Sequence, residues 1–150
     1  SLHDALPICV GTSSWTDGSV KTGKTYYYKI KTVVKTQNGE QTSGFSNVKS
    51  AKAVPAKTTL KAKASDAKNV KLTWSKVKGA SGYEIYRSNS KDGKCSKVKT
   101  ISKGSTTSYK NGKLKKSTTY YYKIRAYRKV NGKKVYGSYS SVVSVKTKAK

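Results

Sequence analysis

Residues Thr119–Tyr127 read T-Y-Y-Y-K-I-R-A-Y and alternate between side chains suited to a core and side chains suited to a surface. A period of two predicts a β-strand with one buried face, because successive side chains of a strand point to opposite sides of its sheet. We expect these side chains to point inward: Tyr120, Tyr122, Ile124 and Ala126. We expect these to point outward: Tyr121, Lys123, Arg125 and Tyr127.

Other segments of the C-terminal two thirds of the chain alternate in the same way. Val70, Leu72 and Trp74 alternate with Lys71 and Thr73. Likewise, Tyr83 and Ile85, expected inside, alternate with Glu84 and Tyr86, expected outside. No window shows the apolar spacing of an amphipathic helix. The pattern therefore predicts an all-β fold.

Turn signals separate the alternating segments. Asp92-Gly93, Asn111-Gly112 and Asn131-Gly132 supply residues that accept positive φ angles, and Asn131-Gly132 is the best hairpin signal of the three. Together with the alternation, they predict a two-sheet antiparallel sandwich of seven strands. The expected strands are 59–64, 70–75, 82–88, 96–101, 107–109, 119–129 and 134–147.

The chain also contains an internal repeat. Tyr26–Ile30 recurs unchanged as Tyr120–Ile124, at an offset of 94 residues. That offset is close to the size of a whole β-sandwich domain and too long for a solenoid unit. We therefore expect residues 10–53 to be the C-terminal part of a first domain and residues 54–150 to be a complete second one. The boundary is expected near Val54-Pro55, where proline cannot donate a ladder hydrogen bond.

Three features of the second copy resemble a fibronectin type III domain: Trp74 ending the second strand, Gly82–Arg87 on the third, and Leu114 six residues before Tyr120. In particular, the chain is similar to the Lys- and Tyr-rich versions that occur in tandem on secreted and wall-attached proteins of Gram-positive bacteria. The proline that the family usually carries two residues after the leucine is replaced by Lys116.

The resemblance implies an immunoglobulin-like sandwich in which Tyr120 is the tyrosine corner, with its ring in the core and its hydroxyl bonded to the backbone upstream. The side chains expected to form the core are Leu72, Trp74, Tyr83, Ile85, Leu114, Tyr120, Tyr122 and Ile124.

Composition argues against catalysis. The 150 residues include one His, two Cys and six acidic residues, and the Ser and Thr residues have no base beside them to activate them. We expect no enzyme activity, no cofactor and no metal site. Cys9 lies before the first copy and Cys95 in the second, so the two imply no disulfide, and Cys95 is expected to be a half-buried small side chain.

The net charge of +27 suggests polyanions as partners. Only three of the 33 cationic residues are Arg, which argues against specific nucleic-acid binding because Arg supplies the bidentate fork for bases and phosphates. No apolar stretch is long enough to span a membrane.

Two functions therefore remain open. The first is a non-catalytic structural or spacer module in a tandem array on an extracellular, secreted or cell-wall-associated bacterial protein, whose partners are neighbouring domains of the same chain. The second is a binding module for an anionic cell-wall polymer or glycan. Its candidate face contains Tyr86, Tyr121, Lys123, Arg125 and Tyr127.

The N-terminal end has an unusual sequence. Ser1–Ile8 resembles the translated end of a common sequencing-library adapter, and Met is absent from the chain. We expect residues 1–9 to be an artefact and the chain to be a fragment.

Overall fold

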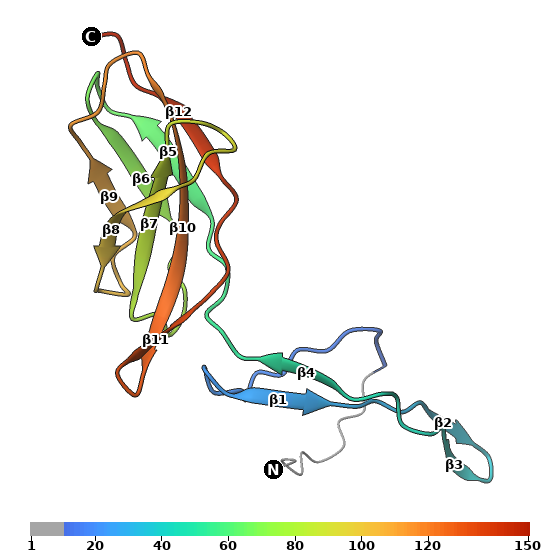
Figure 1. The fold of residues 1–150 in the computed structure, drawn as a ribbon. Coiled ribbons are helices and arrows are strands. Elements are labelled where there is room, and N and C mark those ends of the chain that lie inside the picture. Colours follow the sequence, from blue (N-terminus) through green and yellow to red (C-terminus); the bar gives the residue numbers. More distant parts are fainter. Residues whose placement is uncertain (1–10) are drawn as a thin grey trace. The chain divides into compact units, whose positions relative to one another are not determined.

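The computed structural model describes residues 11–150, so the expected artefact at residues 1–9 lies outside the described residues. The chain divides into two compact units whose boundary lies between Ala53 and Val54. Figure 1 shows both units to be built from strands and irregular connections.

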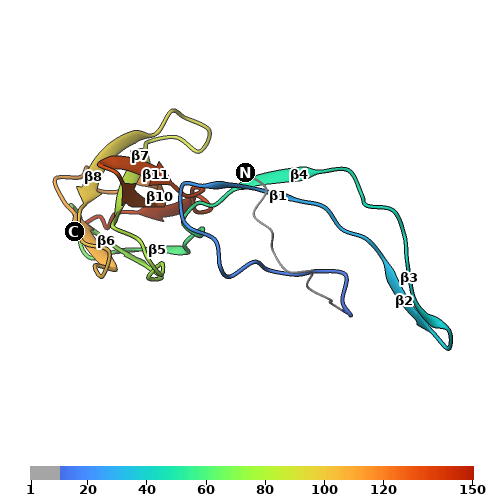
Figure 2. The same cartoon turned by 90° about the horizontal axis from the view of Figure 1, so that it is seen from below.

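The C-terminal unit is an antiparallel sandwich of two sheets. One sheet has the order β5 (Leu60–Ala64), β6 (Val70–Trp74) and β9 (Ser108–Asn111). The other has the order β11 (Lys133–Tyr136), β10 (Thr119–Val130), β7 (Gly82–Ser88) and β8 (Ser96–Ile101), and β12 (Val143–Lys146) also pairs with β10. Figures 1 and 2 show the two layers. The all-β sandwich predicted from the sequence is confirmed.

The seventh expected strand, 134–147, is two strands in the structure. β11 and β12 both pair with β10, but the chain between them keeps only two backbone bonds to it, from the Gly137 and Ser140 amides to the carbonyls of Ala126 and Ile124. There the Ser140 hydroxyl accepts the hydrogen bond of the Ile124 amide at 3.1 Å, a bond that a backbone carbonyl would otherwise accept. Gly137 is required nearby, because a Cβ at this position would collide with the carbonyl of Pro55.

The inner faces of the two sheets form one core. All eight side chains expected in the core are buried, and Leu60, Val70, Val77 and Ala126 complete it. Trp74 packs on Tyr83 with ring centroids 5.4 Å apart. The buried Tyr83 hydroxyl accepts a hydrogen bond from the Val77 amide and donates one to the Gly104 carbonyl. Tyr83 therefore buries a large ring without leaving its polar atom unpaired.

Two further tyrosines of β10 anchor the core to its edges. The Tyr120 hydroxyl accepts the amide hydrogen of Lys115 at 2.9 Å, which is the upstream backbone bond expected of a tyrosine corner. The Tyr122 hydroxyl donates to Asn111 Oδ1 at 2.9 Å, and burial is the main cause that raises the pKa of Tyr122 to about 12. The second bond ties β10 to the last residue of β9, across the two sheets.

The N-terminal unit contains two short two-stranded ribbons. β1 (Thr25–Tyr28) pairs with β4 (Lys49–Lys52), and β2 (Val33–Thr36) pairs with β3 (Gly39–Thr42). Its local hydrogen bonds repeat those of the C-terminal unit at the same offset of 94 residues. The Tyr26 hydroxyl accepts the Lys21 amide as Tyr120 accepts Lys115, and Tyr28 donates to Asp17 as Tyr122 donates to Asn111.

Burial distinguishes the two units. Ile124 is fully buried, whereas its equivalent Ile30 has 74% of its surface exposed. No residue among 11–53 is buried, and Trp15, Val34 and Phe45 are exposed. Within residues 11–53, β1 therefore pairs with β4 as β10 pairs with β12, but the side chains equivalent to the core of the C-terminal unit are not buried.

Truncating Trp74 tests this assignment of the core. Trp74→Ala is expected to cost about 3–5 kcal/mol, the range for removing a buried aromatic side chain, and to leave the C-terminal unit largely unfolded. The matched control is Trp15→Ala, because Trp15 has 47% of its surface exposed and should leave the main transition unchanged. Thermal unfolding followed by circular dichroism measures both, and equal losses in the two variants would mean that the units share one core.

Candidate functional site

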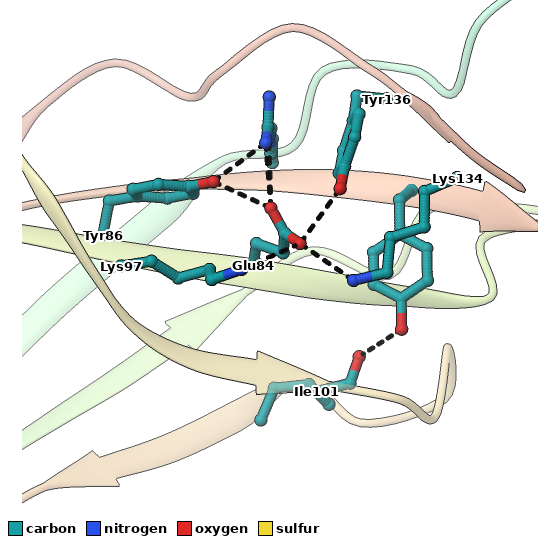
Figure 3. A network of polar contacts seen from close by, with 8 residues as sticks. Glu84, Tyr86, Lys97, Ile101, Lys134 and Tyr136 are labelled. Carbon is teal, nitrogen blue, oxygen red and sulfur yellow. Dashed lines mark hydrogen bonds and ion pairs between the residues drawn. The ribbon is translucent and has the colours of Figure 1, made fainter.

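The outer face of the β7–β10–β11 sheet is organised around a buried carboxylate. Glu84, in the middle of β7, has only 1% of its surface exposed, although the alternation predicts it to be outside. Arg125 Nη2 donates to its Oε2 at 2.9 Å and Lys134 Nζ to its Oε1 at 2.9 Å. The hydroxyls of Tyr86 and Tyr136 donate at 2.8 and 3.2 Å (Figure 3). Glu84 therefore points to the outer face, as the alternation predicts, but neighbouring side chains cover it.

Electrostatics explain how a charged group is held there. Burial raises the pKa of Glu84, but the hydrogen bonds from Lys134, Tyr86 and Arg125 outweigh burial and lower the pKa to about 2. Lys97 Nζ adds a longer contact at 3.6 Å. Glu84 is therefore ionised across the ordinary pH range and neutralises part of the charge of the surrounding cations.

Aromatic rings fix Arg125 in this arrangement. Its guanidinium carbon lies 3.7 Å from the ring centroid of Tyr136 and within 5.5 Å of the centroids of Tyr86 and Tyr139. Arg125 Nη2 also donates to the Tyr86 hydroxyl at 2.8 Å. Tyr86 and Tyr139 pack edge to face with centroids 5.2 Å apart. Nε and Nη2 of Arg125 are therefore already engaged within the protein.

Tyr127 is buried, which corrects its expected outward exposure. Only 1% of its surface is exposed, and it is not part of the core between the sheets. Tyr127 is paired in register with Gly82, and its hydroxyl reaches across to the Ile101 carbonyl at 3.3 Å. A Cβ at Gly82 would lie 2.6 Å from this hydroxyl, so the missing side chain provides the space in which the ring lies. Lys134 covers the ring, with its Nζ 4.5 Å from the centroid.

The five residues expected to form a binding face therefore have different surroundings. Tyr86 and Arg125 are bonded to Glu84, and Tyr127 is buried. Lys123 and Tyr121 remain half-exposed, with Lys123 Nζ 4.4 Å from the centroid of Tyr139. The arrangement cross-links strands β7, β10 and β11 and presents few unpaired groups to a ligand.

The sequence did not reveal five members of this network: Glu84, Lys97, Lys134, Tyr136 and Tyr139. The available signal was the rarity of acidic residues, since an acid placed among aromatic and cationic residues on a strand is a candidate for internal pairing. The partners from β11 could not be found by alternation because they depend on the hairpin register.

Three further features of the described residues bear on possible sites. Within residues 11–150, no group of three or more His, Cys, Asp or Glu side chains is placed to hold a metal ion. Cys95 is a half-exposed free thiol. In the same range, no helix is long and apolar enough to cross a membrane.

Replacing Glu84 by Gln is expected to weaken the dependence of stability on pH. The pKa of Glu84 is about 2 in the folded chain against an ordinary value of 4.5, so its stabilising effect is present above pH 4.5 and is lost as the pH falls through about 2. The difference corresponds to about 3 kcal/mol, at about 1.4 kcal/mol per pKa unit. Urea unfolding at about pH 7 and about pH 2 measures it in both proteins.

The matched control for this experiment is Asp92→Asn, which removes an exposed carboxylate from a loop of the same unit. It should keep the pH dependence of the wild-type chain. Parallel pH curves for Glu84→Gln and the wild type would contradict the assignment of the buried carboxylate.

Several solved structures share this architecture. No family model matches the chain, and no curated protein matches it. Solved structures do match. The FN1–FN3 domains of chicken CNTN1 superpose with a TM-score of 0.55 and 22% identity, over 89% of this chain, which spans 46% of that structure.

Two single-domain structures match the chain over a smaller share. The sixth fibronectin type III domain of human fibronectin type III domain containing protein 3 has a TM-score of 0.55 and 18% identity, over 67% of this chain and 92% of that one. An Fn3-like protein from Clostridium thermocellum has a TM-score of 0.51 and 28% identity, over 63% and 92%. With the two-sheet topology and the hydrogen bond of Tyr120 to the backbone, these matches show that the chain contains a β-sandwich with the fibronectin type III fold.

Proposed function

We propose that the chain is a non-catalytic structural module from a tandem array of fibronectin type III domains on a secreted or cell-wall-associated bacterial protein. The observation that carries the proposal is the repeated pattern of hydrogen bonds in the two units, with a covered core in only one of them. Residues 10–53 are then the C-terminal part of a first domain, and residues 54–150 are a complete second domain.

Equivalent pairs support this division. Thr25 pairs with Lys52 in register as Thr119 pairs with Lys146. The Ile30 amide donates to the Ser46 hydroxyl at 3.1 Å, as the Ile124 amide does to Ser140. Since four such relations occur at one constant offset, a repeated domain is the simplest account of the chain.

The outer face of the second domain supports a mechanical role rather than a catalytic one. Glu84 joins β7 to Arg125 on β10 and to Lys134 on β11, in addition to the backbone ladders. Such cross-links resist sliding of neighbouring strands. Ligand binding at this face has weaker support, because Nε and Nη2 of Arg125 already donate to Glu84 and Tyr86.

Secretion is supported by the resemblance to the Lys- and Tyr-rich fibronectin type III domains of secreted bacterial proteins and by the fibronectin type III fold of the matching solved structures. The match to an Fn3-like protein from Clostridium thermocellum also favours a bacterial setting. The partners implied by this role are the neighbouring domains of the same chain.

Stretching the full chain between its ends tests the proposal by single-molecule force spectroscopy. Residues 54–150 are expected to unfold in one discrete step with a length gain of about 300 Å, from a reach of roughly 3.3–3.6 Å per extended residue. Residues 11–53 should extend at low force without a step, because their apolar face is uncovered. Gradual extension of the whole chain would contradict the role of a mechanical module.

A separate pull-down experiment tests the alternative, that the face containing Tyr121 and Lys123 binds an anionic cell-wall polymer or glycan. Pull-down on purified cell wall at low and high salt should not depend on Tyr121 or Lys123. If the paired change Tyr121→Ser and Lys123→Gln abolished retention, the face would be a binding site and the spacer role alone would be insufficient.

A further inference from the structure

The outer face of the β5–β6–β9 sheet carries a row of lysines that the spacer role does not explain. Lys63 is paired in register with Lys71, and Lys71 is paired with Lys110. The three side chains are exposed and point away from the core, because their neighbours Leu72 and Ala62 point into it. Three like charges therefore lie directly opposite one another across three adjacent strands.

This arrangement is unfavourable for the fold by itself. Like charges directly opposite each other in a sheet are destabilising, and Lys is a poor strand former. Lysines on edge strands protect against edge-to-edge aggregation, which could account for Lys63 on β5 and Lys110 on β9. Lys71 lies on the central strand β6, where no edge needs protection.

The row also lacks a compensating acid. Among residues 11–150, no ion pair involves any of the three lysines. Asp66 is close enough for the charge of Lys110 to help lower its pKa, but its oxygens are bonded to the Lys68 amide and to Asn69. The opposite sheet differs, since Glu84 is surrounded there by its own cations.

The chemistry around the row indicates the class of ligand. Thr73 and Ser108 are paired in register beside it and add hydroxyl donors. Tyr109, between Ser108 and Lys110, packs against the core, and the outward positions of the three strands hold no aromatic side chain. The face therefore offers mainly point charges and hydroxyls to anionic oxygens, and the only aromatic side chain beside the row is the half-buried Tyr109, which packs against the core.

We propose that this face binds a linear chain of phosphate groups that runs across the strands over Lys63, Lys71 and Lys110. Neighbouring strands are about 4.8 Å apart, and the lysine stems are flexible, so the three ammonium groups can follow successive phosphates along a polymer. The proposal goes beyond the spacer role and does not depend on it.

The test compares two triple variants of the full chain with the same change in net charge. The first removes the row: Lys63→Gln, Lys71→Gln and Lys110→Gln. The control removes three exposed lysines elsewhere in the same unit: Lys103→Gln, Lys129→Gln and Lys133→Gln. Affinity for inorganic polyphosphate and for poly(glycerol phosphate) is measured by titration calorimetry over a range of salt concentrations, and thermal unfolding is recorded for each protein.

We expect the row variant to lose at least about tenfold in affinity and to show a shallower salt dependence, because fewer counterions are released. The control should lose much less. The row variant should also unfold at a higher temperature than the wild type, because the repulsion between the lysines is gone, so loss of affinity cannot be attributed to misfolding. The polymer that binds more tightly through the row, polyphosphate or poly(glycerol phosphate), identifies which kind of phosphate chain the face prefers.

Three results would overturn the proposal: no binding of either polymer by the wild-type chain, equal losses in the two triple variants, or tighter binding of an oligodeoxythymidylate of equal charge through the same row. The first two would make the lysines a solvated surface. The third would assign the face to single-stranded nucleic acid. None of them bears on the force measurement, so the spacer role and this proposal can fail separately.

Discussion

A single carboxylate constrains the outer face of the larger sheet. Glu84 lies at the centre of β7, and the ammonium of Lys134, the guanidinium of Arg125 and two tyrosine hydroxyls converge on it. In a chain with 33 cationic and six acidic residues, a buried acid that neutralises several cations at once determines which side chains can remain free. It explains why the most aromatic surface of the domain is occupied internally.

The two units separate the contributions of hydrogen bonding and burial. Both contain the same tyrosine-to-amide and serine-to-amide bonds, at the same spacing. Only the C-terminal unit buries its inward side chains, as the contrast between Ile30 and Ile124 shows. Because the net contribution of a hydrogen bond is small compared with the burial of several large side chains, equal bonding patterns do not imply equal stability.

The sequence allowed the core to be predicted but not the cover of the outer face. Alternation identifies the face to which Tyr83 or Ile124 points, because successive side chains of a strand point to opposite faces of the sheet. Alternation does not predict which other side chains cover that face. Tyr127 and Glu84 point outward as expected, yet both are buried. The ring of Tyr127 lies in the space that Gly82 leaves and is covered by Lys134. Glu84 is covered by Arg125 of β10 and by Lys134 and Tyr136 of β11. The division of the last strand likewise depends on the hydroxyl of Ser140, which no periodicity reveals.

We propose that residues 54–150 form a self-sufficient domain, whereas residues 11–53 keep similar local pairing without a buried core. Native-state hydrogen exchange of the full chain measures this residue by residue, because an amide that exchanges only through global unfolding reports the full stability of its unit. The account predicts that amides of β7 and β10 exchange only through global unfolding and that those of β1 and β4 exchange through local opening with little protection. Comparable protection in β1, β4, β7 and β10 would contradict it.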